Sequence, residues 1–98
     1  MTAYVIAEVD VHDAATFEEY RKLVPATIAQ YGGRYAVRGG ACETKEGGWA
    51  PKRVVVLEFP TVAQANAWYH SPEYAPALAL RHKAAHSKMV IVEGLPPA

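Results

Sequence analysis

Two short segments of the chain are apolar at consecutive positions rather than at alternate ones. They are Arg53 to Phe59, which reads RVVVLEF, and Lys88 to Glu93, which reads KMVIVE. Their β-branched residues indicate strands, and a strand with one face in water normally alternates apolar and polar residues. Both segments are therefore predicted to be strands of a sheet whose two faces are both covered.

The length of the chain limits what can cover those faces. Its 98 residues are expected to form a single domain, residues 1–98, with a folded core over 1–94 and a flexible tail over 95–98. A domain of this size buries only about 60 to 68 % of the surface of its unfolded chain. Because 51 % of the residues are hydrophobic, the folded chain alone leaves apolar surface that another molecule must cover.

Strands and helices alternate along the chain. Ala3 to Val9 and Arg34 to Arg38 are predicted to be strands from their β-branched and aromatic residues. Between them, the apolar spacing from Phe17 to Tyr31 predicts an amphipathic helix. A second helical region, broken in two, is predicted from Thr61 to Ala85. The order is βαββαβ, an α+β split-βαβ fold with helices on one face of a four-stranded antiparallel sheet.

Capping residues and prolines place the helix ends. The first helix is predicted to start at Asp13 or at Thr16, and Pro25 is expected to kink it. In the second helical region, Ser71 is expected to cap a helix whose first residue is Pro72.

Helices on one face leave the other face of the sheet bare. Monomers usually avoid a large exposed apolar patch, and a second copy of the chain can cover it symmetrically. We therefore expect a homodimer in which the sheets of two chains pack face to face.

Charge and cysteine content exclude several classes of function. Lys and Arg number 10 and Asp and Glu number 10, so no net field attracts a polyanion and no nucleic-acid partner is expected. No apolar run approaches the roughly 20 residues that span a bilayer. The single cysteine, Cys42, cannot form an internal disulfide, and no signal peptide is evident, so a cytoplasmic location is expected.

Six segments of the sequence resemble one family. In chain order they read YVIAEVDV, DAATFEEY, RGG, VVVLEFP, AWYHSPEY and VIVEG. On these segments, which cover nearly the whole chain, the sequence resembles the domain-of-unknown-function family 1330 (DUF1330). The resemblance implies the dimeric α+β barrel superfamily, in which two ferredoxin-like protomers join their sheets. It implies no established reaction, because relatives by fold include monooxygenases, isomerases, cyclases and stress-associated proteins.

Three charged residues are the strongest candidates for a polar site. Glu8 and Glu58 lie on the first and third strands, expected to be central, parallel neighbours, and Arg38 ends the strand expected beside Glu58. In one interpretation Glu58 or Glu8 is a general acid or base and Arg38 orients an anionic substrate. In the other, the same residues form a buried ion pair that sets the dimer register, which is the simpler interpretation.

Aromatic residues of the AWYHSPEY segment are candidates for a ligand pocket. Trp68 and Tyr74 are placed to line a pocket beside the sheet for a flat or apolar molecule. The alternative is packing in the core, since aromatic side chains carry much of the buried area of small domains.

No metal or other cofactor is expected. His82 and His86 are four residues apart, as in metal-binding helices, but Lys83 replaces the catalytic glutamate of such motifs and no third ligand is evident.

The function that needs the fewest assumptions is the binding of a small molecule. Its pocket would lie between the sheet and the segment Ala67 to Tyr74, with Arg38, Glu58 and Tyr74 as polar contacts. One alternative is a cofactor-independent enzyme of the isomerase, cyclase or monooxygenase type that uses a barrel carboxylate. Another is a structural or stress-associated dimer without a ligand. A cavity of about 300 Å³ or more with converging polar groups favours the first two, and a filled interior favours the third.

Overall fold

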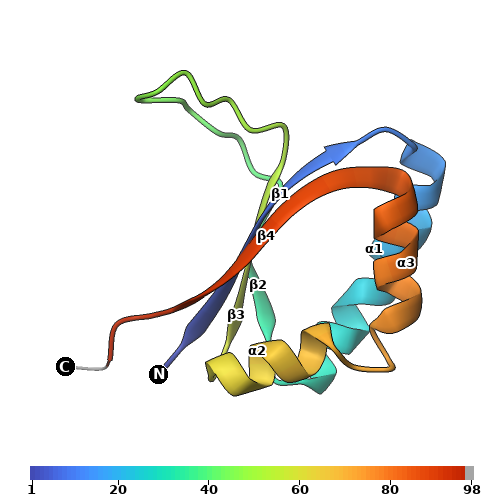
Figure 1. The fold of residues 1–98 in the computed structure, drawn as a ribbon, viewed down its shortest axis with the longest axis vertical. Helices are drawn as coiled ribbons and strands as arrows, with labels where there is room; N and C mark the ends of the chain where they lie inside the picture. The colour runs from blue at the N-terminus through green and yellow to red at the C-terminus, as the bar shows by residue number, and fades with distance from the viewer. Residues whose placement is uncertain (97–98) are drawn as a thin grey trace.

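The computed structural model describes residues 1–96. In chain order the elements are β1 (Ala3–Val11), α1 (Ala14–Gln30), β2 (Arg34–Arg38), β3 (Val54–Phe59), α2 (Val62–Tyr69), α3 (Ala75–Ala84) and β4 (Ala85–Glu93). The strands form one antiparallel sheet in the order β2-β3-β1-β4 (Figure 1). The predicted α+β, ferredoxin-like fold is confirmed. The predicted tail at 95–98 falls partly on residues 97 and 98, which lie outside the described residues.

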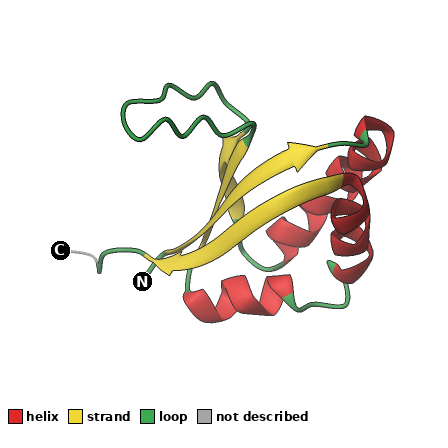
Figure 2. Cartoon of the chain, turned by 45° about the horizontal axis from the view of Figure 1, so that its top comes forward, coloured by secondary structure: helices red, strands yellow, loops and turns green. Residues whose placement is uncertain are grey.

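Alternation along β1 explains why one face of the sheet carries the helices. Val5, Ala7 and Val9 are at most 4 % exposed, whereas Ile6 on the opposite face is 38 % exposed. All three helices lie on one side of the sheet, and the long connection between β2 and β3 projects away from them (Figure 2). No helix within residues 1–96 is long and apolar enough to cross a membrane.

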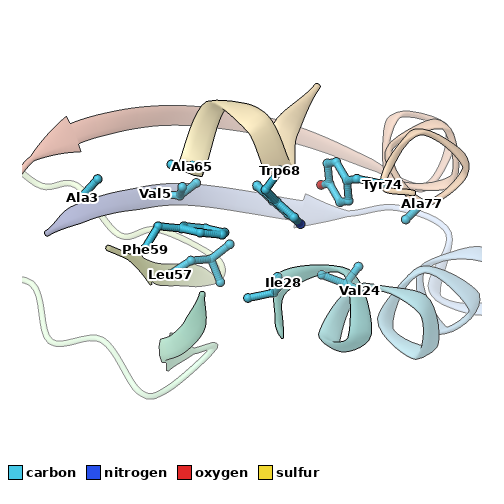
Figure 3. Close-up of a cluster of buried hydrophobic side chains, with 10 residues drawn as sticks. All are labelled: Ala3, Val5, Val24, Ile28, Leu57, Phe59, Ala65, Trp68, Tyr74 and Ala77. Carbon is cyan, nitrogen blue, oxygen red and sulfur yellow. The ribbon is translucent and has the colours of Figure 1, made fainter. Parts of the chain in front are cut away.

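Aromatic rings fill the core between helices and sheet (Figure 3). Trp68, at the centre, is 1 % exposed and points from α2 toward α1. Its ring centroid lies 4.2 Å from that of Tyr74 and 5.5 Å from that of Phe59. The centre of the core is therefore aromatic, which supplies much buried area in a short chain.

The start of α1 is fixed by Asp13. Its Oδ1 accepts a hydrogen bond from the Thr16 amide at 3.1 Å, and its Oδ2 accepts one from the Thr16 hydroxyl at 2.7 Å. Of the two starts predicted, the structure has the one at Asp13. The helix continues through Pro25 to Gln30.

The second helical region is divided as predicted, but α3 starts later than expected. The Ser71 hydroxyl accepts a hydrogen bond from the Tyr74 amide at 3.1 Å, which closes a turn at Pro72 rather than capping a helix there. The helix begins at Ala75, and Pro76 lies in its first turn. A proline is tolerated at that position because the first amides of a helix have no partner within it.

The prediction that β1 and β3 are parallel is wrong. They pair antiparallel, with Glu58 opposite Tyr4 and Glu8 opposite Val54. The helical crossover through α1 makes β1 and β2 parallel, so β3, which lies between them, must run the other way. Glu8 and Glu58 are consequently four positions apart along paired strands, about 13 Å at 3.3 Å per residue. The prediction that they lie close together is also wrong.

Candidate functional site

The helices and the covered face of the sheet enclose a small cavity, here called the helix–sheet pocket. Its volume is about 40 Å³, and one water needs roughly 10 to 15 Å³, so it has room for a few waters or a small chemical group. This is well below the volume that by itself would indicate a ligand site. The apolar part of the lining consists of Val5, Ala7, Val9, Phe17, Val24, Val55, Leu57, Trp68 and Met89.

Four arginines and two tyrosines, Tyr20 and Tyr35, complete the wall of the pocket. The arginines are Arg21, Arg38, Arg53 and Arg81, and no aspartate or glutamate lines the pocket. The whole chain has 10 Lys and Arg against 10 Asp and Glu, so the pocket gathers positive charge in a protein that is neutral overall. Such separation of charge favours an anion in the pocket.

Arg81 is the buried member of this set. Its side chain reaches the pocket from the last turn of α3, is 3 % exposed, and leaves its Nε without a hydrogen-bond partner. Neighbouring positions on the same helical face hold Ala77 and Ala84, which are also buried and too small to fill the space beside the sheet. A cation is favourable near a helix C-terminus, but only by a small amount.

Two of the other arginines are stacked on aromatic rings. The Cζ atom of Arg38 lies 4.4 Å from the ring centroid of Tyr35, and that of Arg53 lies 5.5 Å from the ring centroid of Phe17. Stacking uses the flat faces of the guanidinium groups and leaves their N–H edges available to an anion. Gly39, at φ 72°, makes room for Arg53, because a Cβ atom there would lie 3.0 Å from its Cζ.

A pair of tyrosine hydroxyls lies at the pocket. The Tyr20 and Tyr74 oxygens are 3.1 Å apart, and either can be the donor. Burial, and then the neighbouring Tyr74, raise the pKa of Tyr20 far above its ordinary value, so the Tyr20 hydroxyl is protonated at neutral pH. Two hydroxyls that share one hydrogen bond leave one hydrogen for another acceptor. The Trp68 indole nitrogen, in contrast, already donates to the Thr27 hydroxyl at 3.1 Å.

The structure brings together only some of the residues predicted to form the site. Arg38 and Trp68 line the pocket, and Tyr74 lies behind it, fully buried against Trp68. Glu8 and Glu58 lie on the opposite face of the sheet.

The predicted pairing of Arg38 with Glu58 is wrong. Glu58 forms an ion pair with Arg34 instead, and Arg38 stands opposite Val55. Because β2 and β3 are antiparallel, the start of β2 rather than its end meets the end of β3.

The face of the sheet without helices, here called the open face, carries an apolar row across all four strands. Val37, Val56, Ile6 and Val90 stand at matched positions on β2, β3, β1 and β4. Val37, Ile6 and Val90 are 39, 38 and 58 % exposed. The open face is therefore apolar along its centre in the single chain.

Charged residues flank the apolar row on the open face. On one side lies the ion pair of Arg34 with Glu58. On the other side Glu8 accepts a hydrogen bond from the Trp49 indole nitrogen at 2.9 Å, which ties the long β2–β3 connection to the sheet.

The two histidines considered as metal ligands lie on different elements. His82 is in α3, but the chain passes directly from Ala84 into β4, so His86 is in a strand. The His86 ring lies 4.9 Å from that of His12. Within residues 1–96 no group of three or more His, Cys, Asp or Glu side chains is placed to hold a metal ion.

Comparison with protein families identifies the chain. The family model described as "Domain of unknown function (DUF1330)" matches residues 2–95. The chain belongs to the DUF1330 family. No curated protein matches it.

Solved structures share the fold of this DUF1330 chain at low sequence identity. The RPA0582 protein of unknown function from Rhodopseudomonas palustris has a TM-score of 0.74 at 18 % identity, covering 98 % of this chain and 84 % of its own. A dimeric ferredoxin-like protein of unknown function from Jannaschia sp. CCS1 gives 0.70 at 12 % identity, covering 96 % and 100 %. SnoaB, a cofactor-independent oxygenase from Streptomyces nogalater, gives 0.66 at 14 % identity, covering 98 % and 95 %. At such identities the likeness establishes the fold alone.

Sequence reasoning missed five tyrosines and arginines of the pocket of this DUF1330 protein: Tyr20, Arg21, Tyr35, Arg53 and Arg81. For Arg81 a signal was present, because it occupies a helical position that follows Leu78 and precedes Ala85 on the apolar side. A charged residue on the buried stripe of a helix is unusual. No comparable signal marks Arg53, which the long β2–β3 connection brings to the pocket.

Proposed function

We propose that this DUF1330 protein binds a small molecule in the helix–sheet pocket. The observation that carries the proposal is the composition of the pocket, an apolar lining that also holds four arginines and Tyr20, whose hydroxyl is hydrogen-bonded to Tyr74 behind the pocket. Ligand sites combine apolar walls with a few convergent polar groups. A cavity that served packing alone would be expected to hold apolar groups, since charged side chains are rarely buried without a partner. Arg38 and Trp68, predicted from the sequence, are among its lining residues.

An enzyme that uses a carboxylate base has less support. The two candidate bases, Glu8 and Glu58, lie on the open face, and no carboxylate or imidazole lines the pocket. Burial raises the pKa of Tyr20, so its hydroxyl stays protonated at neutral pH and is a poor base. One fold relative, SnoaB, is an oxygenase, but the pocket of this chain favours a binding protein over such an enzyme.

Two copies of the chain are proposed to join through the open face. The apolar row supports this, and so do fold relatives described as dimeric. The Arg34–Glu58 ion pair beside the row fits the structural interpretation of Glu58, in which it sets the register between copies. A cytoplasmic location and the lack of a nucleic-acid partner stay predictions.

The pocket proposal is tested by filling the cavity. Ala7 is 4 % exposed and lines the pocket, so Ala7→Leu is expected to occupy the space. Ala29→Leu makes the same change on the exposed side of α1 and is the control. A set of small aromatic and aliphatic molecules, both neutral and anionic, is titrated while the Trp68 indole signal is followed by NMR.

The expected result is that some of these molecules shift the Trp68 signal in the wild type and in Ala29→Leu but not in Ala7→Leu. If no molecule shifts that signal, or if Ala7→Leu binds as the wild type does, the pocket is not a ligand site.

A further inference from the structure

The charge of Arg81 is the feature that points beyond small-molecule binding in general. The residue is only 3 % exposed, and its Nε has no hydrogen-bond partner. Within residues 1–96 the ion pairs involve Arg21, Arg34 and Lys45, but not Arg81. Because an uncompensated buried charge destabilises a fold, a guanidinium aimed into a cavity needs a counter-anion.

We propose that the ligand is an organic carboxylate, whose carboxylate group binds the Arg81 guanidinium and whose apolar body packs against Val55, Leu57 and Trp68. This inference rests on the proposed function, since it names the chemical class of ligand for the same pocket. Arginine presents paired N–H donors in a planar fork that matches the two oxygens of a carboxylate.

The rest of the lining fits this ligand. No acidic side chain in the pocket competes for Arg81. The Tyr20–Tyr74 pair has one hydroxyl hydrogen that is not used between them, and a carboxylate oxygen accepts it. The apolar walls contact carbon rather than water, which favours an organic acid over inorganic phosphate.

The mouth of the pocket suits the entry of an anion. Arg38 and Arg21 are exposed and Arg53 is half-buried, and Arg38 and Arg53 are held by their stacking on Tyr35 and Phe17. Positive charge around a narrow opening raises the local concentration of anions and their rate of association. At about 40 Å³, the cavity itself accepts the carboxylate and a short part of the apolar body.

The test compares benzoate with benzamide, a neutral molecule of the same shape, and with inorganic phosphate. Binding to the full chain is followed by NMR at the Arg81 Nε–H and Trp68 Nε1–H signals. Benzoate is expected to shift both signals and to bind at least about tenfold more tightly than benzamide, because a hydrogen bond to a charged group contributes more than a neutral one. Phosphate is expected to compete weakly.

Variants then assign the preference to Arg81. In Arg81→Met, benzoate is expected to bind no more tightly than benzamide does. Lys83→Met removes the same charge from an exposed position on α3 and should keep the wild-type preference. Since benzoate and benzamide are compared first in the wild type, the inference can fail even if Arg81→Met does not fold.

Each other outcome overturns the inference in a distinct way. Equal binding of benzoate and benzamide, with a shift at Trp68, leaves the pocket a ligand site but removes the anion. Phosphate that binds as tightly as benzoate indicates an inorganic anion instead. If neither benzoate nor phosphate shifts the Arg81 signal, Arg81 has another partner, and the neutral molecules of the Ala7→Leu experiment decide the proposed function separately.

Discussion

Replacing Arg81 by methionine should stabilise the ligand-free protein. Arg81 is 3 % exposed and its Nε has no hydrogen-bond partner. Removing an uncompensated buried charge recovers about 2 to 4 kcal/mol once a few waters in the pocket are allowed for. The favourable interaction with the C-terminus of α3 is lost, at a cost of about 0.3 to 1 kcal/mol. Methionine is unbranched and fills the space of the arginine stem. The net gain is about 1 to 3 kcal/mol, and each kcal/mol raises Tm by about 4 to 8 °C.

The assay is urea unfolding followed by far-UV circular dichroism at one fixed protein concentration, because the stability of a dimer depends on concentration. Lys83→Met, on the exposed side of the same helix, should stay within about 0.5 kcal/mol of the wild type. A loss of about 1 kcal/mol or more in Arg81→Met, with Lys83→Met unchanged, would refute the reasoning. Arg81 would then already be compensated in the free protein.

Three further predictions concern the fold and the open face. In Gly33→Ala the new Cβ would lie 2.5 Å from Cε1 of the buried Phe59, so a loss of about 1 to 3 kcal/mol is expected by urea unfolding; Gly40→Ala meets nothing within 4 Å, and a similar loss there would contradict the steric explanation. Ile6→Lys on the open face should give a monomer in sedimentation experiments, whereas Leu23→Lys on α1, at 45 % exposure, should stay dimeric; a dimeric Ile6→Lys variant would place the interface elsewhere. Hydrogen bonds from the Thr16 hydroxyl and amide lower the pKa of Asp13 from 3.8, so the contribution of Asp13 to stability is complete above pH 3.8 and is lost as the pH falls through the lowered pKa. The variant Asp13→Asn keeps a cap that does not titrate and should lack this loss. Identical acid profiles of the two proteins in urea unfolding would contradict this role of Asp13.

Local sequence patterns were sufficient for the elements and for the two faces of the sheet. The burial of Val5 and the exposure of Ile6 follow from alternation along one strand, and the division of the second helical region follows from Ser71 and the prolines around it. These features depend on neighbours in the sequence, which the pattern contains.

The errors concern how distant segments meet. Placing Arg38 beside Glu58 required the direction of β3 relative to β2, and the pairing observed is Arg34 with Glu58. Periodicity carries no information about strand direction. The last strand was predicted to begin at Lys88, but β4 begins at Ala85 and includes His86. No glycine or proline follows Ala84 to mark the end of α3.

The two alternatives that the sequence left open for a buried charge, a structural ion pair or a functional site, are separated by the presence of a partner. Glu58 packs on the open face with Arg34 as its counter-ion, so its charge is compensated within the chain and a role in assembly suffices to explain it. Arg81 packs on the other face without a counter-ion among residues 1–96, beside a cavity that the fold leaves unfilled. We therefore propose that this charge, which costs stability and has no compensating group among residues 1–96, is compensated by a ligand that enters the pocket. On this reasoning we propose that the helical side of the sheet binds the ligand and that the open face joins two copies.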